Sequence, residues 1–317
     1  MKKQQTLGII YQLIASALFG FSFIAVKLGV DEVAPVTLLA WRFTIAFATM
    51  SICALTGLIK INLRGKRIWP VLLMALFQPI LYFSGETMGI KLTTASESGT
   101  VMACIPIVTL LLATRMLKEK PTKLQAIGII ISVLGVVLVG LAKGLSASLN
   151  IAGYLLLVLA MLSDSFYVVF SRKADGFTSM EKTYVMMGCG AFIFTVSAFV
   201  FHGFNGTVVE FLTAPFNNIK FLIGLIYLGI CCSIVGFFMV NRSIELLGAT
   251  RASSFAGLST IIAVLSGVII LGEKFSFLQG VGTAMVMLGV YASNVTPKNS
   301  VPVEWSVHDN TTGDNMQ

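Results

Sequence analysis

Charged residues are scarce in this chain of 317 residues. Lysine, arginine, aspartate and glutamate together make up 11% of it, whereas 56% of the residues are hydrophobic. A soluble domain carries about 25% charged residues, so this composition excludes a water-facing surface around most of the chain. The mean hydropathy of +0.90 agrees with that exclusion. We therefore expect the lipid bilayer to be the solvent for most of the protein.

Sequence motifs for cofactors and catalysis are also missing. Five cysteines and two histidines occur, without the spacing of a metal or redox site. The absence of a GxxxxGK[ST] phosphate loop excludes ATP as the direct driver of any activity. The net charge of +8 lies in short loops, with no basic face interleaved with aromatic residues. We expect no cofactor, no metal and no nucleic-acid partner.

What the chain does have is a series of ten apolar runs. Most are long enough to cross a hydrocarbon core of about 30 Å, and in lipid such segments must be helices to satisfy their backbone polar groups. The runs cover residues 8–28, 36–58, 68–90, 96–116, 124–141, 151–171, 184–201, 219–240, 249–271 and 277–293. The sequence predicts an all-α integral membrane protein with ten transmembrane helices.

The two halves of the chain repeat one another. Leu-x-Glu-Lys at 117–120 recurs at 271–274, and Leu-Gln-x-x-Gly at 124–128 recurs at 278–282, both at an offset of 154 residues. Each copy follows one apolar run and precedes another. The repeated Glu119 and Glu273 are interpreted as anchors of the turn. A duplicated hydrophobic half is typical of secondary transporters.

The repeats are predicted to be inverted, because five helices per half make the second half enter the membrane from the opposite side. The starts of the halves match at an offset of 145, as in Gly8 and Gly153. The difference from 154 implies nine extra residues in the second half, placed in the long connection 203–218. We assign residues 1–147 and 148–296 to the two repeats, and 297–317 to a polar cytoplasmic tail.

A pair of small residues also recurs in the fourth and ninth helices. Gly99-x-x-x-Ala103 becomes Ser253-x-x-x-Gly257 at the same offset of 154. Small residues four apart let helix backbones approach closely. We expect these helices to pack tightly at equivalent places, and against each other.

The distribution of lysine and arginine predicts the orientation. With the N-terminus in the cytoplasm, sixteen fall on the cytoplasmic side and five on the outer side, with Arg42 inside the second helix. The outer five are Lys27, Lys91, Lys143, Lys220 and Lys274. Both termini are therefore predicted to be cytoplasmic, and a bacterial plasma membrane is the expected location.

Several stretches resemble one transporter family. They are the first-helix segment LFGFSFIAVK at 18–27, Trp41-Arg-Phe in the second helix, LTTASES at 92–98, and both Glu-Lys elements. Together they resemble the EamA family of the drug/metabolite transporter superfamily, over about residues 8–295. The resemblance implies an exporter of amino acids or other small metabolites with a central cavity between the halves.

Asp164 is the clearest candidate for a functional residue. It lies well inside the sixth apolar run, close to Tyr167. A charge near the bilayer centre costs on the order of 3 kcal/mol, so it needs a partner, a wet cavity or a function. Asp164 is either a cavity carboxylate that binds a substrate ammonium or carries a proton, or a hydrogen-bond anchor between helices.

Four more charged residues lie at similar depth toward the outer side. Glu86 follows Tyr82 in the third helix, Glu97 begins the fourth, and Arg42 and Lys27 lie near the outer ends of the second and first. They either pair with one another or form a gate or carboxylate site, where Arg42 would bind in bidentate fashion. Glu97 is also a candidate helix cap.

Less specific candidates complete the predicted site. Ser22, Phe238, Asn241 and Ser254 lie in apolar runs where their side chains would reach a cavity. With these residues we expect a secondary transporter of small molecules, with protons as the candidate coupling ion. We expect a monomer or homodimer that is not an enzyme. A lipid flippase, a membrane-embedded enzyme and a sensor remain as alternatives.

Overall fold

The computed structural model describes residues 2–116, 123–144, 150–174, 176–253 and 255–294, and all regular structure in these ranges is helical. Glu119, Ser254 and the tail 297–317 lie outside the described residues. The helices are α1 (Lys2–Glu32), α2 (Pro35–Leu55), α3 (Trp69–Ala75), η1 (Leu76–Leu81), α4 (Tyr82–Leu92), α5 (Ala95–Met102), α6 (Ile105–Met116), α7 (Lys123–Gly144), α8 (Ile151–Lys173), α9 (Ser179–Asn205), α10 (Val208–Asn217), α11 (Ile219–Ile226), η2 (Tyr227–Gly236), α12 (Phe237–Leu247), α13 (Ala249–Ser253), α14 (Ala256–Leu271) and α15 (Phe277–Asn294).

Seven helical stretches of the described chain are long and apolar enough to cross a membrane. They correspond to the first four and to the sixth, seventh and eighth predicted helices. Shorter apolar helices, Gly257–Leu271 and Phe277–Gly289, occupy the ninth and tenth positions, and α7 occupies the fifth. The all-helical membrane fold is therefore present, while the full count of ten spans stays a prediction.

The third helix of each half departs from a regular α-helix, by a kink in the first half and by a wide, π-helical turn in the second. In the first half η1 joins α3 to α4, and in the second half η2 joins α11 to α12. Gln78 within η1 has extended backbone angles (φ −144°, ψ 114°) and precedes Pro79, which lacks a backbone donor. The kink and the wide turn occur at corresponding positions of the two halves, and wide turns inside helices are frequent at functional sites.

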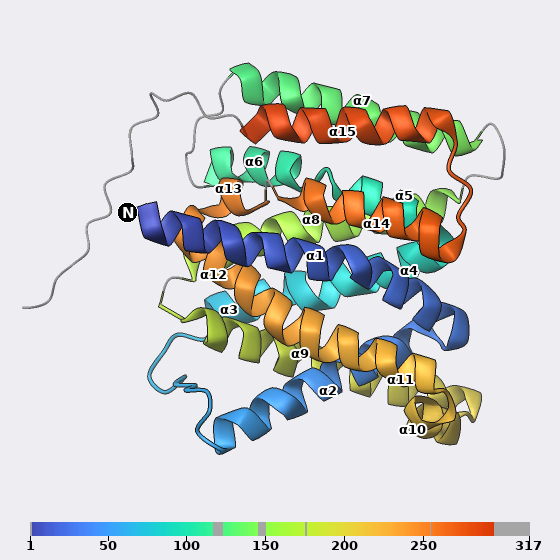
Figure 1. The fold of residues 1–317 in the computed structure, drawn as a ribbon. Helices are drawn as coiled ribbons and strands as arrows, with labels where there is room; N and C mark the ends of the chain where they lie inside the picture. Colours follow the sequence, from blue (N-terminus) through green and yellow to red (C-terminus); the bar gives the residue numbers. More distant parts are fainter. Residues whose placement is uncertain (1, 117–122, 145–149, 175, 254, 295–317) are drawn as a thin grey trace, which may run out of the picture.

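Reciprocal glycine contacts relate α7 to α15, which lie side by side at the top of Figure 1. Gly135 packs against Gly282, and Gly289 packs against Gly128, so closely that a Cβ on either Gly135 or Gly289 would collide with the facing backbone. Residues 128 and 135 correspond to 282 and 289 at the offset of 154. Such reciprocity is what a two-fold relation between the halves requires.

A second reciprocal pair joins the first helix of each half to the other half. Gly8 of α1 packs against residues 246–247 at the end of α12, and Gly153 of α8 packs against residues 92–93 at the end of α4. Gly8 corresponds to Gly153 at the offset of 145, and residues 92–93 correspond to residues 246–247 at the offset of 154. Each half therefore packs its first helix onto the third helix of the other.

The change of offset is located where α10 forms. This helix occupies Val208–Asn217, inside the connection expected to hold nine extra residues, whereas residues 56–68 of the first half contain no helix. The connection of the second half thus contains a helix without a counterpart in the first half, and Phe211 and Ala214 of α10 are buried in the hydrophobic core.

The fourth and ninth predicted helices do contact each other, as α5 and α14. Gly99 packs against Ala263, and the hydroxyl of Thr260 donates to the carbonyl oxygen of Gly99 at 2.8 Å. Ala103 packs instead against Val286 of α15, and Gly257 is buried.

Candidate functional site

A cavity of about 90 Å³ lies between the two halves, large enough for a few water molecules. Helices of both halves contribute to its wall: α1, η1, α4, α5 and α6 from the first, and α8, α12, α13 and α14 from the second. Its lining comprises Gln12, Ser16, Phe19, Ser22, Phe23, Gln78, Tyr82, Phe83, Glu86, Met102, Ile105, Asp164, Tyr167, Val168, Phe237, Val240, Ile244, Ala252, Ser253 and Ser259.

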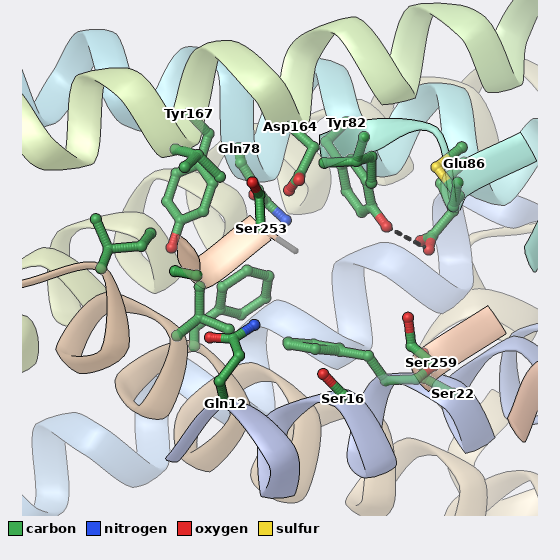
Figure 2. Close-up of a pocket in the computed structure, with 18 of the residues that line it drawn as sticks. Gln12, Ser16, Ser22, Gln78, Tyr82, Glu86, Asp164, Tyr167, Ser253 and Ser259 are labelled. Carbon is green, nitrogen blue, oxygen red and sulfur yellow. Dashed lines mark hydrogen bonds between the residues drawn. The ribbon is translucent and has the colours of Figure 1, made fainter. Parts of the chain in front are cut away.

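One wall of the cavity is acidic. Asp164 of α8 and Glu86 of α4 both line it, and they are the charged residues among the described lining (Figure 2). The Tyr82 hydroxyl donates to Glu86 Oε1 at 2.7 Å, while Gln78 lies against Asp164. Carboxylates that share a site repel each other when both are ionised, so this wall favours a bound proton or a cation.

Arg42 lies behind this wall and not on the cavity surface. Its side chain is 1% exposed, its Nε donates to Ser233 Oγ at 2.9 Å, and its guanidinium lies 4.2 Å from the ring centroid of Phe83. Phe83 lines the cavity and so separates it from Arg42. In the described chain no ion pair joins Arg42 to Glu86, although charges interact over longer distances in a low-dielectric interior.

Tyr167 and Asn241 form one unit. The ring of Tyr167 lines the cavity, and its hydroxyl donates to Asn241 Oδ1 at 3.0 Å. Asn241 is fully buried, does not line the cavity, and also accepts from Ser171 and donates to Thr183. Asn241 therefore orients Tyr167 and does not itself face the cavity.

The remaining predicted residues separate into two groups. Ser22 lines the cavity, and its hydroxyl donates to the carbonyl oxygen of Phe19 at 2.7 Å. Ser253, predicted only as a helix-packing residue, also lines the cavity. Phe238 lies elsewhere, beside the ring of Tyr11, and Phe237 takes its expected place on the cavity wall.

Two of the four outer charged residues, Lys27 and Glu97, do not belong to the described lining of the cavity. Lys27 pairs with Asp31 at 3.6 Å. Glu97 caps α5, accepting from the backbone of Thr94, and also accepts from the Tyr154 hydroxyl at 2.8 Å. Glu273 binds the same helix end, accepting from the backbone nitrogens of Ala95 and Ser96 at 2.8 and 3.0 Å. Their contacts are those of helix capping and local pairing.

Sequence reasoning missed two glutamines. Gln12 and Gln78 both line the cavity, and the Oε1 atom of each is buried without a hydrogen-bond donor. The available signal was an amide inside an apolar run, in the case of Gln78 directly before Pro79.

Comparison with known proteins gives a consistent result. The model of the EamA-like transporter family matches the chain twice, at residues 6–141 and 151–295. The uncharacterized transporter YcxC of Bacillus subtilis (strain 168) is 35% identical over 297 residues, covering 93% of this chain and 95% of the relative. The WAT1-related protein At2g40900 of Arabidopsis thaliana is 26% identical over 78% of this chain and 68% of its own length. One solved crystal structure has the same fold, with a TM-score of 0.62 and 20% identity, over 91% of this chain and 98% of that one.

Proposed function

Because the chain belongs to the EamA-like transporter family, we propose that it is a secondary transporter that moves small metabolites, amino acids or related compounds, out across a bacterial plasma membrane. The two halves would rock about the central cavity and expose it to each side in turn. The observation that carries this proposal is the pair of carboxyls, Asp164 and Glu86, on the wall between the halves.

The charges around the cavity support coupling to protons. If all three groups are ionised, Arg42, Glu86 and Asp164 leave one negative charge in excess. Asp164 is the less compensated carboxyl, because the positive charge of Arg42 acts on Glu86, which also accepts from Tyr82. A buried excess charge is costly. Asp164 would therefore hold either a proton or the ammonium group of a substrate, and exchange of the two would couple efflux to proton entry.

The direct test uses purified protein in liposomes loaded with labelled amino acids. Efflux that is accelerated by an inward pH gradient would support a proton-coupled exporter, whereas gradient-insensitive efflux would indicate a facilitator and remove proton coupling. Movement of labelled lipid between leaflets without any solute efflux would favour a flippase instead.

The Asp164→Asn variant tests the role of this carboxyl. Loss of a charged hydrogen-bond partner costs about 1.5–3 kcal/mol, so gradient-driven efflux should fall about tenfold or more. Asp31→Asn is the matched control, because the Asp31 side chain is 56% exposed and pairs only locally with Lys27. Full efflux by Asp164→Asn would exclude this carboxyl from the mechanism.

A further inference from the structure

Three residues that line the cavity carry an acceptor that receives no hydrogen bond from the described part of the chain. Gln12 Oε1, Gln78 Oε1 and Glu86 Oε2 are buried, belong to residues that line the cavity, and accept no hydrogen bond. A buried acceptor without a donor costs about 1–3 kcal/mol. All three are oxygen atoms, so the site calls for a ligand that brings donors.

Four of the hydroxyl donors that line the cavity are already used. The hydroxyls of Tyr82 and Tyr167 donate to Glu86 and Asn241, and those of Ser16 and Ser22 donate to backbone carbonyl oxygens. A hydroxyl has one hydrogen to donate. These four groups can therefore accept a hydrogen bond from a ligand without giving up a bond within the protein, but they cannot donate to one.

The charges of the lining agree with this hydrogen-bond pattern. Asp164 and Glu86 are both acidic, and Arg42 lies behind the ring of Phe83 with its Nε bound to Ser233. A ligand carboxylate in the cavity would face two carboxyl groups with no cation of the described lining beside it.

The internal repeat shows that the acidic groups occur on one side only. At the offsets of 145 and 154, Asp164 corresponds to Phe19 and Glu86 corresponds to Val240, and both of these uncharged residues also line the cavity. The positions that correspond to the carboxyls are thus uncharged, and together with Phe23, Phe237 and Ile244 they give the cavity apolar surface for a hydrocarbon group.

From these observations we infer that the cavity selects an ammonium group attached to an uncharged, apolar body, and that it binds amines more tightly than the amino acids with the same side chain. An ammonium group supplies donors and no acceptor, which matches the three free oxygens and the acidic wall. The inference rests on the proposed function, because it names the substrate class of the same cavity.

Equilibrium binding to the purified full-length protein in detergent tests the inference without transport. The probes are leucine, its decarboxylated amine 3-methylbutylamine, 4-methylpentanoate, and linear amines of increasing length. We expect an amine to bind about tenfold or more tightly than leucine and 4-methylpentanoate not to bind, because a ligand carboxylate would face the two carboxyl groups of the cavity without a compensating cation. Leucine binding as tightly as 3-methylbutylamine, or no binding of any amine by protein that is helical and monodisperse, would overturn it.

Variants locate the binding to the cavity. Glu86→Gln should weaken amine binding about tenfold, whereas the same change at the exposed Glu210 of α10 should leave it unaltered. Gln12→Leu, on the α1 side of the cavity, removes a second acceptor and should also weaken amine binding. Unchanged amine binding in both cavity variants would overturn the assignment.

The outcomes of the two proposals are separable. A protein that binds amines but moves no solute in liposomes upholds the amine site and contradicts the proposed transport. A protein that exports leucine and binds it as tightly as the amine upholds transport and contradicts the amine preference.

Discussion

Single charged side chains in apolar runs were the most informative residues of the sequence. Asp164 and Glu86 stood out because a charge in lipid needs compensation, and both line the cavity. That they share one wall could not be predicted, because it depends on α8 packing against α4. Gln12 and Gln78 were missed because an amide costs far less to bury than a charge, so its presence in an apolar run is a weaker signal.

Glu273 allows a test at the scale of one residue. Its carboxylate accepts from Ala95 N, Ser96 N and the Ser96 hydroxyl, and so satisfies the first turn of α5. Replacing a helix cap by alanine costs about 0.5–2 kcal/mol. We expect Glu273→Ala to lower the melting temperature of the purified protein, and Lys274→Ala, at an exposed neighbour, to leave it unchanged. Equal melting of the two variants would contradict the capping role.

At the scale of the element, the wide turn of η2 explains why Phe237 and not Phe238 lines the cavity. Regular helices repeat faces at i, i+3 and i+4, and a wide turn shifts that phase for all residues that follow. Phe237 follows η2 directly. The hydropathy of the run 219–240 contains no mark of such a turn, so its position was visible only in the structure.

The α7–α15 contact gives a matched pair of glycine substitutions on one helix. A Cβ at Gly289 would collide with the backbone of Gly128 and Ser132, whereas a Cβ at Gly280 would meet only the ring edge of Phe275 at 3.7 Å. Alanine is favoured over glycine in a helix by about 1 kcal/mol, but overpacking costs about 1–3 kcal/mol. We expect Gly289→Ala to lower the melting temperature and Gly280→Ala to maintain or raise it. The reverse order would contradict the close approach.

At the scale of the whole molecule, the sequence predicted the repeat through the offsets of 154 and 145, and the family match at 6–141 and 151–295 fits that layout. The sequence did not show that the halves interlock. Gly8 on α12 and Gly153 on α4 are contacts between halves, and no motif within one half specifies its partner in the other. This interlocking places the cavity between the halves and leaves its acidic groups on one side.

The orientation of the molecule in the membrane is a prediction at this scale, and it can be measured directly. Lys66 pairs with Glu181 at 2.6 Å, which holds the connection 56–68 at the N-terminal end of α9, whereas Asn205 ends that helix. A helix of 27 residues is about 40 Å long, so the two positions lie on opposite sides of a bilayer.

Cysteines placed at the exposed Arg64 and Asn205 in a variant without the native cysteines should react differently with an impermeant maleimide. In intact cells we expect labelling at residue 205 alone, and in inverted vesicles at residue 64 alone, because lysine and arginine gather on the cytoplasmic side. The opposite pattern would place both termini on the outer side and contradict the predicted orientation.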